Sequence, residues 1–181
     1  MHTPRTTFKK SIQTIGILFI TIALLVTGRA LAAGALDPTF GANGVVTTTI
    51  GDFANAAALL IQPDGKLVTA GSSYNGSNYD FALARYLGDG SLDSSFGSGG
   101  ILTTDFNASD NWGNAAALQA DGKILVAGSY TNGDQDDFAL ARYNSNGTLD
   151  TSFSSDGKLT TDFSGSQDWG MAVAVQAEGK L

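Results

Sequence analysis

The sequence contains no cysteine, and its single histidine is His2. Without thiols no disulfide can form, so the chain must be held together by packing alone. Beyond His2 there is no imidazole, which excludes serine–histidine–aspartate and cysteine–histidine catalysis and most zinc sites. Paired carboxylates remain possible, but the recurring aspartates lie at expected turns and strand ends, where they have a structural role. We therefore expect no catalytic residue and no cofactor.

Glutamate and basic residues are also scarce. Of the 17 acidic residues, 16 are aspartate and only Glu178 is glutamate. Aspartate favours turns whereas glutamate favours helices, so this bias indicates many turns and little helix. Beyond residue 32 the chain has six basic residues against the 17 acidic ones, a net charge of about −11. Such a surface repels phosphate groups, and we expect neither nucleic acid nor an anionic membrane as a partner.

The start of the chain, up to Ala32, has the pattern of a secretory signal peptide. Three basic residues precede an apolar run from Ile15 to Val26, and small residues follow up to Ala32. This order is typical of a segment that is cleaved, here after Ala32. The alternative is an uncleaved membrane anchor, but the run is short compared with the roughly 20 residues of a spanning helix. The pattern predicts a helical signal at residues 1–32, a mature domain at residues 33–181, and export to the periplasm, the cell surface or the medium.

The rest of the chain is organised by an internal repeat. The seven residues from Asp80 to Tyr86 recur unchanged from Asp137 to Tyr143. Between residues 80–106 and 137–163, 19 of 27 positions are identical at a constant offset of 57. A fixed period of this length is typical of stacked or circular repeat proteins. The repeat residues that we expect to hold the architecture are Asp80, Phe81, Arg85, Tyr86, Asp137, Phe138, Arg142 and Tyr143.

Each repeat is expected to hold four short strands joined by tight turns. Asp64-Gly65 lies between two apolar runs, a strong signal for a β-hairpin, and Asp89-Gly90 has the same chemistry. After the signal, no segment of about ten residues shows helical spacing. The four strands predicted for the first repeat span residues 56–62, 66–72, 80–86 and 91–96. Residues 102–106 then lead towards the next repeat.

This pattern predicts an all-β fold of the β-propeller type. Four antiparallel strands per period are typical of a propeller blade, whose faces are covered by the neighbouring blades. A chain of separate β-sandwiches is the alternative, whereas the coils of a parallel β-helix are shorter than this period. The chain holds about two and a half repeats, too few to close a ring. We therefore expect a piece of a longer propeller, or self-association if the chain is complete.

The motifs also resemble a known family. They are Leu-Asp-x-Ser/Thr-Phe-Gly at Leu36 and Leu92, Gln-Pro-Asp-Gly-Lys at Gln62, and Asp-Phe-Ala-Leu-Ala-Arg-Tyr at Asp80 and Asp137. Together and in this order they resemble the bacterial delta-60 repeat, a propeller-type module of exported proteins. The likeness covers essentially the whole chain after the signal, although Ser154 stands where two other copies have glycine. The resemblance implies architecture and export from a bacterial cell, and it implies no catalytic residue.

The densest acidic cluster is the loop that holds Asp134, Asp136 and Asp137. Calcium favours several oxygen ligands on a flexible loop, so these three residues are the candidate metal ligands. The spacing does not match an EF-hand, and the corresponding loop of the first repeat has lost most of the charge. A solvated loop without a metal is therefore the favoured interpretation.

Two further pairs of residues stand out. Arg85 and Arg142 lie in otherwise apolar strands, where a guanidinium needs a partner, and ion pairs with an aspartate such as Asp93 or Asp150 are the expected structural role. Trp112 and Trp169 occupy equivalent places, each before a glycine. An exposed tryptophan could stack on a sugar ring, but a large aromatic residue that closes the edge of a blade is the more common role.

These features favour a binding or scaffold module without catalytic activity. Its expected partners are an extracellular protein or glycan of unknown identity and the other blades of the same longer chain. A passive structural spacer is one alternative. The other is part of a propeller hydrolase or lyase whose catalytic residues lie in further blades.

Overall fold

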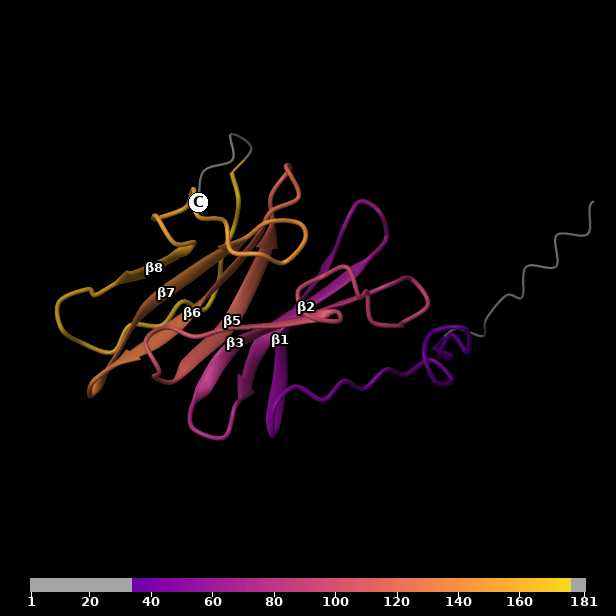
Figure 1. Cartoon of the computed structure of the whole chain (residues 1–181), viewed down its shortest axis with the longest axis horizontal. Helices are drawn as coiled ribbons and strands as arrows, with labels where there is room; N and C mark the ends of the chain where they lie inside the picture. Colours follow the sequence, from indigo (N-terminus) through magenta and orange to yellow (C-terminus); the bar gives the residue numbers. More distant parts are fainter. Residues whose placement is uncertain (1–33, 177–181) are drawn as a thin grey trace, which may run out of the picture.

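The computed structural model describes residues 34–176, so the predicted signal peptide and its cleavage site at Ala32 lie outside the described residues. Within this range the chain forms eight strands and no helix, arranged as two four-stranded antiparallel sheets that lie side by side (Figure 1). The first sheet consists of β1 (Phe53–Ile61), β2 (Leu67–Tyr74), β3 (Tyr79–Tyr86) and β4 (Ile101–Thr104), in this order. The second sheet consists of β5 (Asn111–Leu118), β6 (Ile124–Asn132), β7 (Gln135–Tyr143) and β8 (Lys158–Thr161). None of the described segments is a helix long and apolar enough to cross a membrane.

The all-β class and the four antiparallel strands of each repeat are confirmed. Tight turns join the first strands of each sheet, as the aspartate–glycine pairs predict. In the turn between β1 and β2, the Gln62 N–H donates to the Lys66 carbonyl over 2.9 Å, and Gly65 adopts a φ of +83°. Gly122 has the same φ in the turn between β5 and β6. Glycine adopts this left-handed conformation without a steric penalty, so the pairs determine where each hairpin folds.

The predicted strand at residues 91–96 is wrong. After β3 the chain forms a single bridge between Tyr86 and Leu92 and then turns. The Asp93 carboxylate accepts hydrogen bonds from the backbone N–H and the hydroxyl of Ser95, at 3.0 and 2.6 Å. These bonds favour a turn over an extended strand. The fourth strand is instead β4, which pairs with β3 and includes much of the segment that the sequence assigns to the connection between repeats.

The main core lies between the two sheets. One face of the first repeat meets the opposite face of the second repeat there. The first sheet contributes buried side chains that include Phe81 and Leu83, whereas the second contributes Ala141 and Tyr143 among others. Successive side chains of a strand point to opposite faces of its sheet. The first repeat therefore presents the face with Phe81 to the second sheet, and the second repeat presents the face with Tyr143 to the first sheet.

Hydrogen bonds between tyrosine and threonine tie each repeat to the segment before it. The Tyr143 hydroxyl on β7 donates to the Thr104 hydroxyl on β4 over 2.8 Å. Tyr86 donates in the same way to Thr48, also over 2.8 Å. Thr48 thus lies beside the first sheet as Thr104 lies beside the second sheet. The segment of residues 36–50 is in this respect equivalent to the end of the first repeat.

The two sheets approach closely where glycine allows it. A Cβ atom at Gly113 on β5 would collide with the backbone carbonyl of Gly71 on β2. The Gly113 N–H also donates to the Ser72 hydroxyl over 2.9 Å, a bond that is buried between the sheets. Backbone thus packs directly on backbone, which places β5 against the face of the first sheet.

Candidate functional site

The ion pairs of Arg85 with Asp93 and of Arg142 with Asp150 have a structural role. Arg85 Nε lies 2.8 Å from Asp93 Oδ2, and Arg142 Nε lies 2.8 Å from Asp150 Oδ2, as the sequence predicts. The Arg85 guanidinium also lies 4.6 Å from the centroid of the Phe96 ring. The Arg85 and Asp93 side chains are only 6% and 8% exposed. Because these charges are paired and enclosed within the fold, they are not available to a ligand.

Hydrogen bonds lower the pKa values of Asp93 and Asp150, the aspartates of these ion pairs. The bond from the Ser95 hydroxyl holds the pKa of Asp93 well below its usual range, and bonds from the Ser95 backbone and Lys66 act in the same direction. The Ser152 hydroxyl lowers the pKa of Asp150 in the same way. Both carboxyl groups are therefore ionised at neutral pH, and neither is suited to act as a general acid.

Asp80 and Asp137, which begin the recurring strand motif, are both buried. Each accepts a hydrogen bond at Oδ2 from an asparagine amide, over 2.9 Å from Asn75 and over 3.1 Å from Asn132. The two asparagines hold equivalent positions of the repeat, so this bond recurs with it. Burial raises the pKa of Asp80. Both aspartates thus lie in equivalent polar corners of the two sheets.

The three candidate metal ligands of the acidic loop do not come together. Asp136 directs its carboxylate to Thr131 and Trp169, whose side chains donate over 2.7 and 2.9 Å. Asp134 lies at the exposed tip of the turn between β6 and β7. Asp137 follows Asp136 on β7, and adjacent side chains of a strand point to opposite faces. Adjacency in the sequence therefore does not produce a shared site here.

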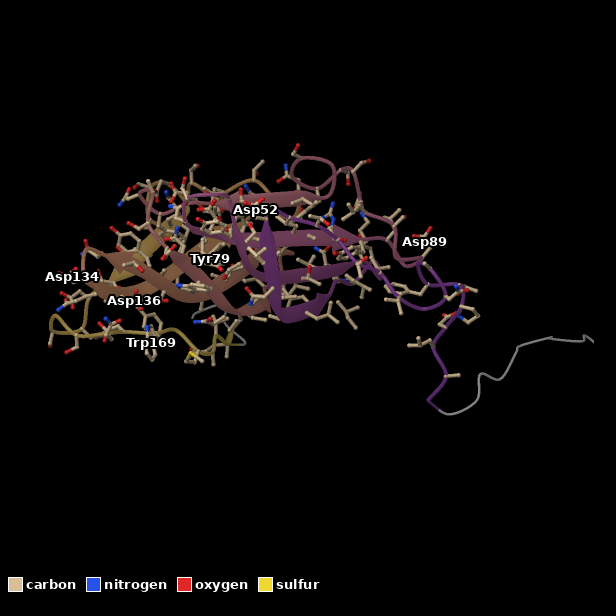
Figure 2. All side chains as sticks on the ribbon, turned by 90° about the horizontal axis from the view of Figure 1, so that it is seen from below. Asp52, Tyr79, Asp89, Asp134, Asp136 and Trp169 are labelled. Carbon is tan, nitrogen blue, oxygen red and sulfur yellow. The ribbon has the colours of Figure 1, made fainter. Side chains whose placement is uncertain are left out.

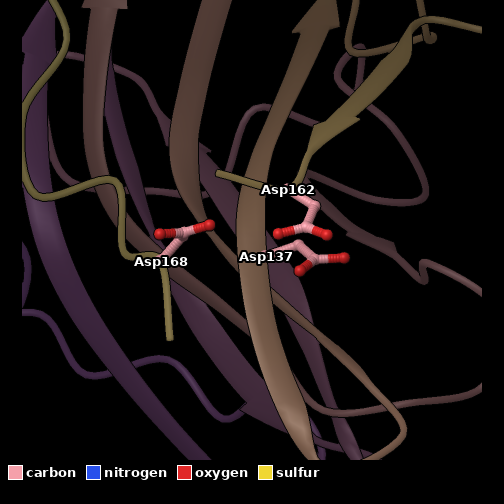
Figure 3. Close-up of side chains that lie close together, drawn as sticks. All are labelled: Asp137, Asp162 and Asp168. Atoms are coloured by element: carbon pink, nitrogen blue, oxygen red, sulfur yellow. The ribbon is translucent and has the colours of Figure 1, made fainter. Parts of the chain in front are cut away.

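Asp137 lies instead beside two aspartates that are distant in the sequence. Single carboxylate oxygens of Asp137, Asp162 and Asp168 all lie within 4.8 Å of one another (Figure 3). Asp137 is on β7, Asp162 directly follows β8, and Asp168 belongs to the segment that follows. The Asp168 N–H donates to the Asp136 carbonyl over 2.6 Å, which places this segment along the start of β7. We refer to Asp137, Asp162 and Asp168 as the acidic triad.

A hollow of about 290 Å³ lies between the second sheet and the segment that follows β8. Its lining residues are Trp112, Asn114, Ser129, Asp136, Trp169 and Met171. The two tryptophans occupy equivalent repeat positions, and Asp136 and Trp169 lie at the same end of the molecule in Figure 2. We refer to this site as the tryptophan hollow.

The two tryptophans of the hollow differ in their surroundings. Trp112 is half-buried and stacks on Tyr79, with ring centroids 4.1 Å apart. Trp169 is 57% exposed, and its indole N–H donates to Asp136 Oδ2 over 2.9 Å. Asp136 holds the repeat position that Tyr79 holds in the first repeat. The indole of Trp169 is therefore fixed by a hydrogen bond and not covered by a second ring.

The lining of the tryptophan hollow combines an apolar ring with polar side chains. The exposed indole provides an apolar stacking surface, and the side chains of Asn114, Ser129 and Asp136 provide an amide, a hydroxyl and a carboxylate. Its lining contains no basic residue and no nucleophile paired with a base. A second hollow, beside residues 46–50, is lined mainly by alanine, valine, threonine and glycine.

Two segments of the chain, residues 62–96 and 119–153, match the family described as "Domain of unknown function (DUF5122) beta-propeller". The two matches begin at equivalent positions of the repeat, and each contains the second and third strands of one sheet. Each sheet has four antiparallel strands, the number in a propeller blade, so the matches and the fold both support a repeat of the β-propeller type. None of the curated proteins compared with the chain matches it.

Sequence reasoning missed Asp162 and Asp168 as candidate ligands. The repeat contains the signal that could have identified them, because Asp105 and Asn111 hold the equivalent positions of the first repeat. A change from an amide at Asn111 to a carboxylate at Asp168 adds a charge beside two aspartates that recur. The sequence does predict the equivalence of Trp112 and Trp169, but it does not show which of them is exposed.

Proposed function

We propose that the chain is an exported, non-catalytic binding module that takes a carbohydrate ligand in the tryptophan hollow. One observation carries this proposal: the exposed indole of Trp169 lies beside an amide, a hydroxyl and a carboxylate around a single hollow. A sugar presents an apolar C–H face as well as hydroxyl groups, so a stacking ring flanked by polar groups suits it. A neutral glycan is favoured over an anionic one because of the acidic surface.

The pattern of residues 1–32 and the delta-60-like motifs support export. The first residue of the exported chain tests this half of the proposal. Amino-terminal sequencing of the secreted protein should begin at Ala33, whereas a chain that still begins at Met1 would contradict it.

The binding half is tested with the purified chain and a panel of soluble oligosaccharides and insoluble polysaccharides. Binding is measured by tryptophan fluorescence and by co-sedimentation. Trp169→Ala should weaken binding roughly tenfold, or about 1.4 kcal/mol, because it removes the stacking surface. Phe53→Ala is the matched control, since Phe53 is an aromatic residue that is 69% exposed outside the hollow, and it should bind like the wild type.

The outcomes separate the proposal from its alternatives. If no sugar binds, the hollow is not a carbohydrate site and the passive spacer is favoured. If Trp169→Ala and Phe53→Ala weaken binding equally, the affinity is not located in the hollow. If a bound oligosaccharide is cleaved, the chain is an enzyme and the non-catalytic proposal is wrong.

A further inference from the structure

The carboxylate of Asp136 lines the tryptophan hollow without a positive partner. Its Oδ1 accepts a hydrogen bond from the Thr131 hydroxyl over 2.7 Å, and its Oδ2 accepts one from the Trp169 indole over 2.9 Å. Each carboxylate oxygen can accept a second hydrogen bond, so the group can still bind further donors. Within residues 34–176 Asp136 forms no ion pair, and the lining of the hollow contains no lysine or arginine. A ligand in the hollow therefore meets an uncompensated negative charge.

Asn114 also presents an oxygen to the hollow. Its amide N–H groups are directed to the Gly170 carbonyl, over 3.2 Å, and to the sulfur of Met171, over 3.8 Å. Among residues 34–176, no group donates a hydrogen bond to its side-chain carbonyl oxygen. The N–H groups of Asn114 and of the Trp169 indole are thus already bound to protein acceptors. These two side chains offer a ligand an oxygen and an aromatic face.

Ser129 adds a buried hydroxyl to the lining of the hollow. It is only 2% exposed, and within residues 34–176 its hydroxyl forms no hydrogen bond. The equivalent Ser72 hydroxyl of the first repeat accepts the Gly113 N–H over 2.9 Å. In the second repeat the equivalent Gly170 N–H donates instead to the Gly128 carbonyl, over 3.0 Å. The Ser129 oxygen therefore remains available to a donor on a ligand.

The equivalent location in the first repeat is filled and uncharged. Tyr79 holds the position of Asp136 there, and its ring stacks on Trp112 with the centroids 4.1 Å apart. In the second repeat a carboxylate replaces the phenol ring, and the equivalent Trp169 is 57% exposed beside it (Figure 2). The difference between the repeats thus leaves an aromatic face and a negative charge at the same place.

We propose that the ligand of the tryptophan hollow is an amino sugar with a free, protonated amine. The inference rests on the proposed carbohydrate function of the same hollow and names the class of sugar. A primary ammonium group has three N–H donors and no acceptor, which suits the oxygens of Asp136, Asn114 and Ser129. Its charge compensates that of Asp136, and the face of an indole attracts a cation. N-acetylation removes this charge and two of the donors, so an acetylated sugar lacks both features.

Three β-1,4-linked oligosaccharides of equal length test the proposal on the purified chain: oligomers of glucosamine, of N-acetylglucosamine and of glucose. Their sugars differ only at the second carbon, which carries an ammonium, an acetamide or a hydroxyl group. Binding is measured by isothermal titration calorimetry and by tryptophan fluorescence. The glucosamine oligomer should bind at least about fivefold more tightly than the other two, since only it pairs with the carboxylate. Added salt should reduce this preference because it screens the two charges.

Asp136→Asn removes the charge but keeps an oxygen for the indole N–H of Trp169. It should abolish the preference for the amine and change the affinity for the glucose oligomer by less than about twofold. Retained binding of the glucose oligomer shows that the hollow is intact in this variant. Asp134→Asn is the matched control, because it removes an exposed charge outside the lining of the hollow and should keep the preference.

The outcomes separate the amino-sugar inference from the proposed function. Equal affinity of the wild type for the three oligosaccharides would overturn the inference and leave the carbohydrate function standing. An equal loss of preference in Asp134→Asn and Asp136→Asn would also overturn it, since the acidic surface as a whole would then attract the amine. If none of the three oligosaccharides binds, the inference fails together with the proposed function.

Discussion

Arg85 and Arg142 have the same partners but not the same surroundings. Each forms an ion pair with the aspartate that follows its strand and lies over a phenylalanine ring. Arg85 also donates to the carbonyl of Ser145 in the second repeat. The Arg142 side chain is 19% exposed, compared with 6% for Arg85. We therefore expect the ion pair of this motif to contribute differently to the free energy of unfolding in the two repeats.

Asp93→Asn should destabilise the chain by about 3 kcal/mol, because it leaves the Arg85 guanidinium buried without a counter-charge. Asp150→Asn is the matched change in the second repeat, and it should cost less because water reaches the Arg142 guanidinium. Urea unfolding followed by tryptophan fluorescence measures both free energies. Equal costs for the two variants would contradict the difference in burial as the cause.

Acid provides a second readout of the same pair. Because the pKa of Asp93 is lowered in the folded chain, the unfolded chain binds a proton at this residue at a higher pH than the folded chain. The stabilisation is therefore complete above the ordinary carboxyl pKa of 3.8 and is lost as the pH falls through the lowered value. Asp93→Asn should lose stability less steeply below about pH 4 than the wild type, and a parallel loss would show that Asp93 does not contribute.

At the scale of the elements, the sequence predicts what depends on local chemistry. The hairpins β1–β2 and β5–β6 follow from aspartate–glycine pairs, since the glycine conformation alone determines where the chain reverses. Residues 91–96 show why the sequence does not predict the position of the fourth strand. Leu92 and Phe96 would lie on one face of an extended segment, but the Asp93 carboxylate accepts hydrogen bonds from Ser95 and the chain turns. A pattern of apolar and polar residues does not indicate such a competing side-chain hydrogen bond.

The candidate sites depend on packing between elements, and here the sequence is less informative. It groups Asp137 with Asp134 and Asp136 because they are adjacent, whereas neighbouring strand residues point to opposite faces. The partners of Asp137 come from beyond β8, and only their equivalence to Asp105 and Asn111 in the repeat indicates them. Comparison of equivalent positions across a repeat is thus a better guide to a shared site than local charge density.

At the scale of the whole molecule, the two repeats pack through different faces of the same motif, so their interface is not symmetric. Phe81 and Leu83 of the first sheet share one buried core with Ala141 and Tyr143 of the second, although the same seven-residue motif provides both sets. Every contact between consecutive repeats can therefore use the same pair of faces, as in other repeat proteins whose stability comes from nearest-neighbour contacts. The stability of each sheet then depends on its neighbour as well as on its own strands.

Phe81→Ala tests this dependence. Phe81 is fully buried between the sheets, so its removal should cost about 3–5 kcal/mol and should lower the amide protection of β2 and β6 together. Phe138→Ala is the matched control, because Phe138 holds the equivalent repeat position but is only half-buried on the opposite face. It should cost less and leave the protection of β2 nearly unchanged. Hydrogen exchange followed by mass spectrometry measures both, and a loss of protection in Phe81→Ala that is confined to the first sheet would show that the two sheets are stable independently.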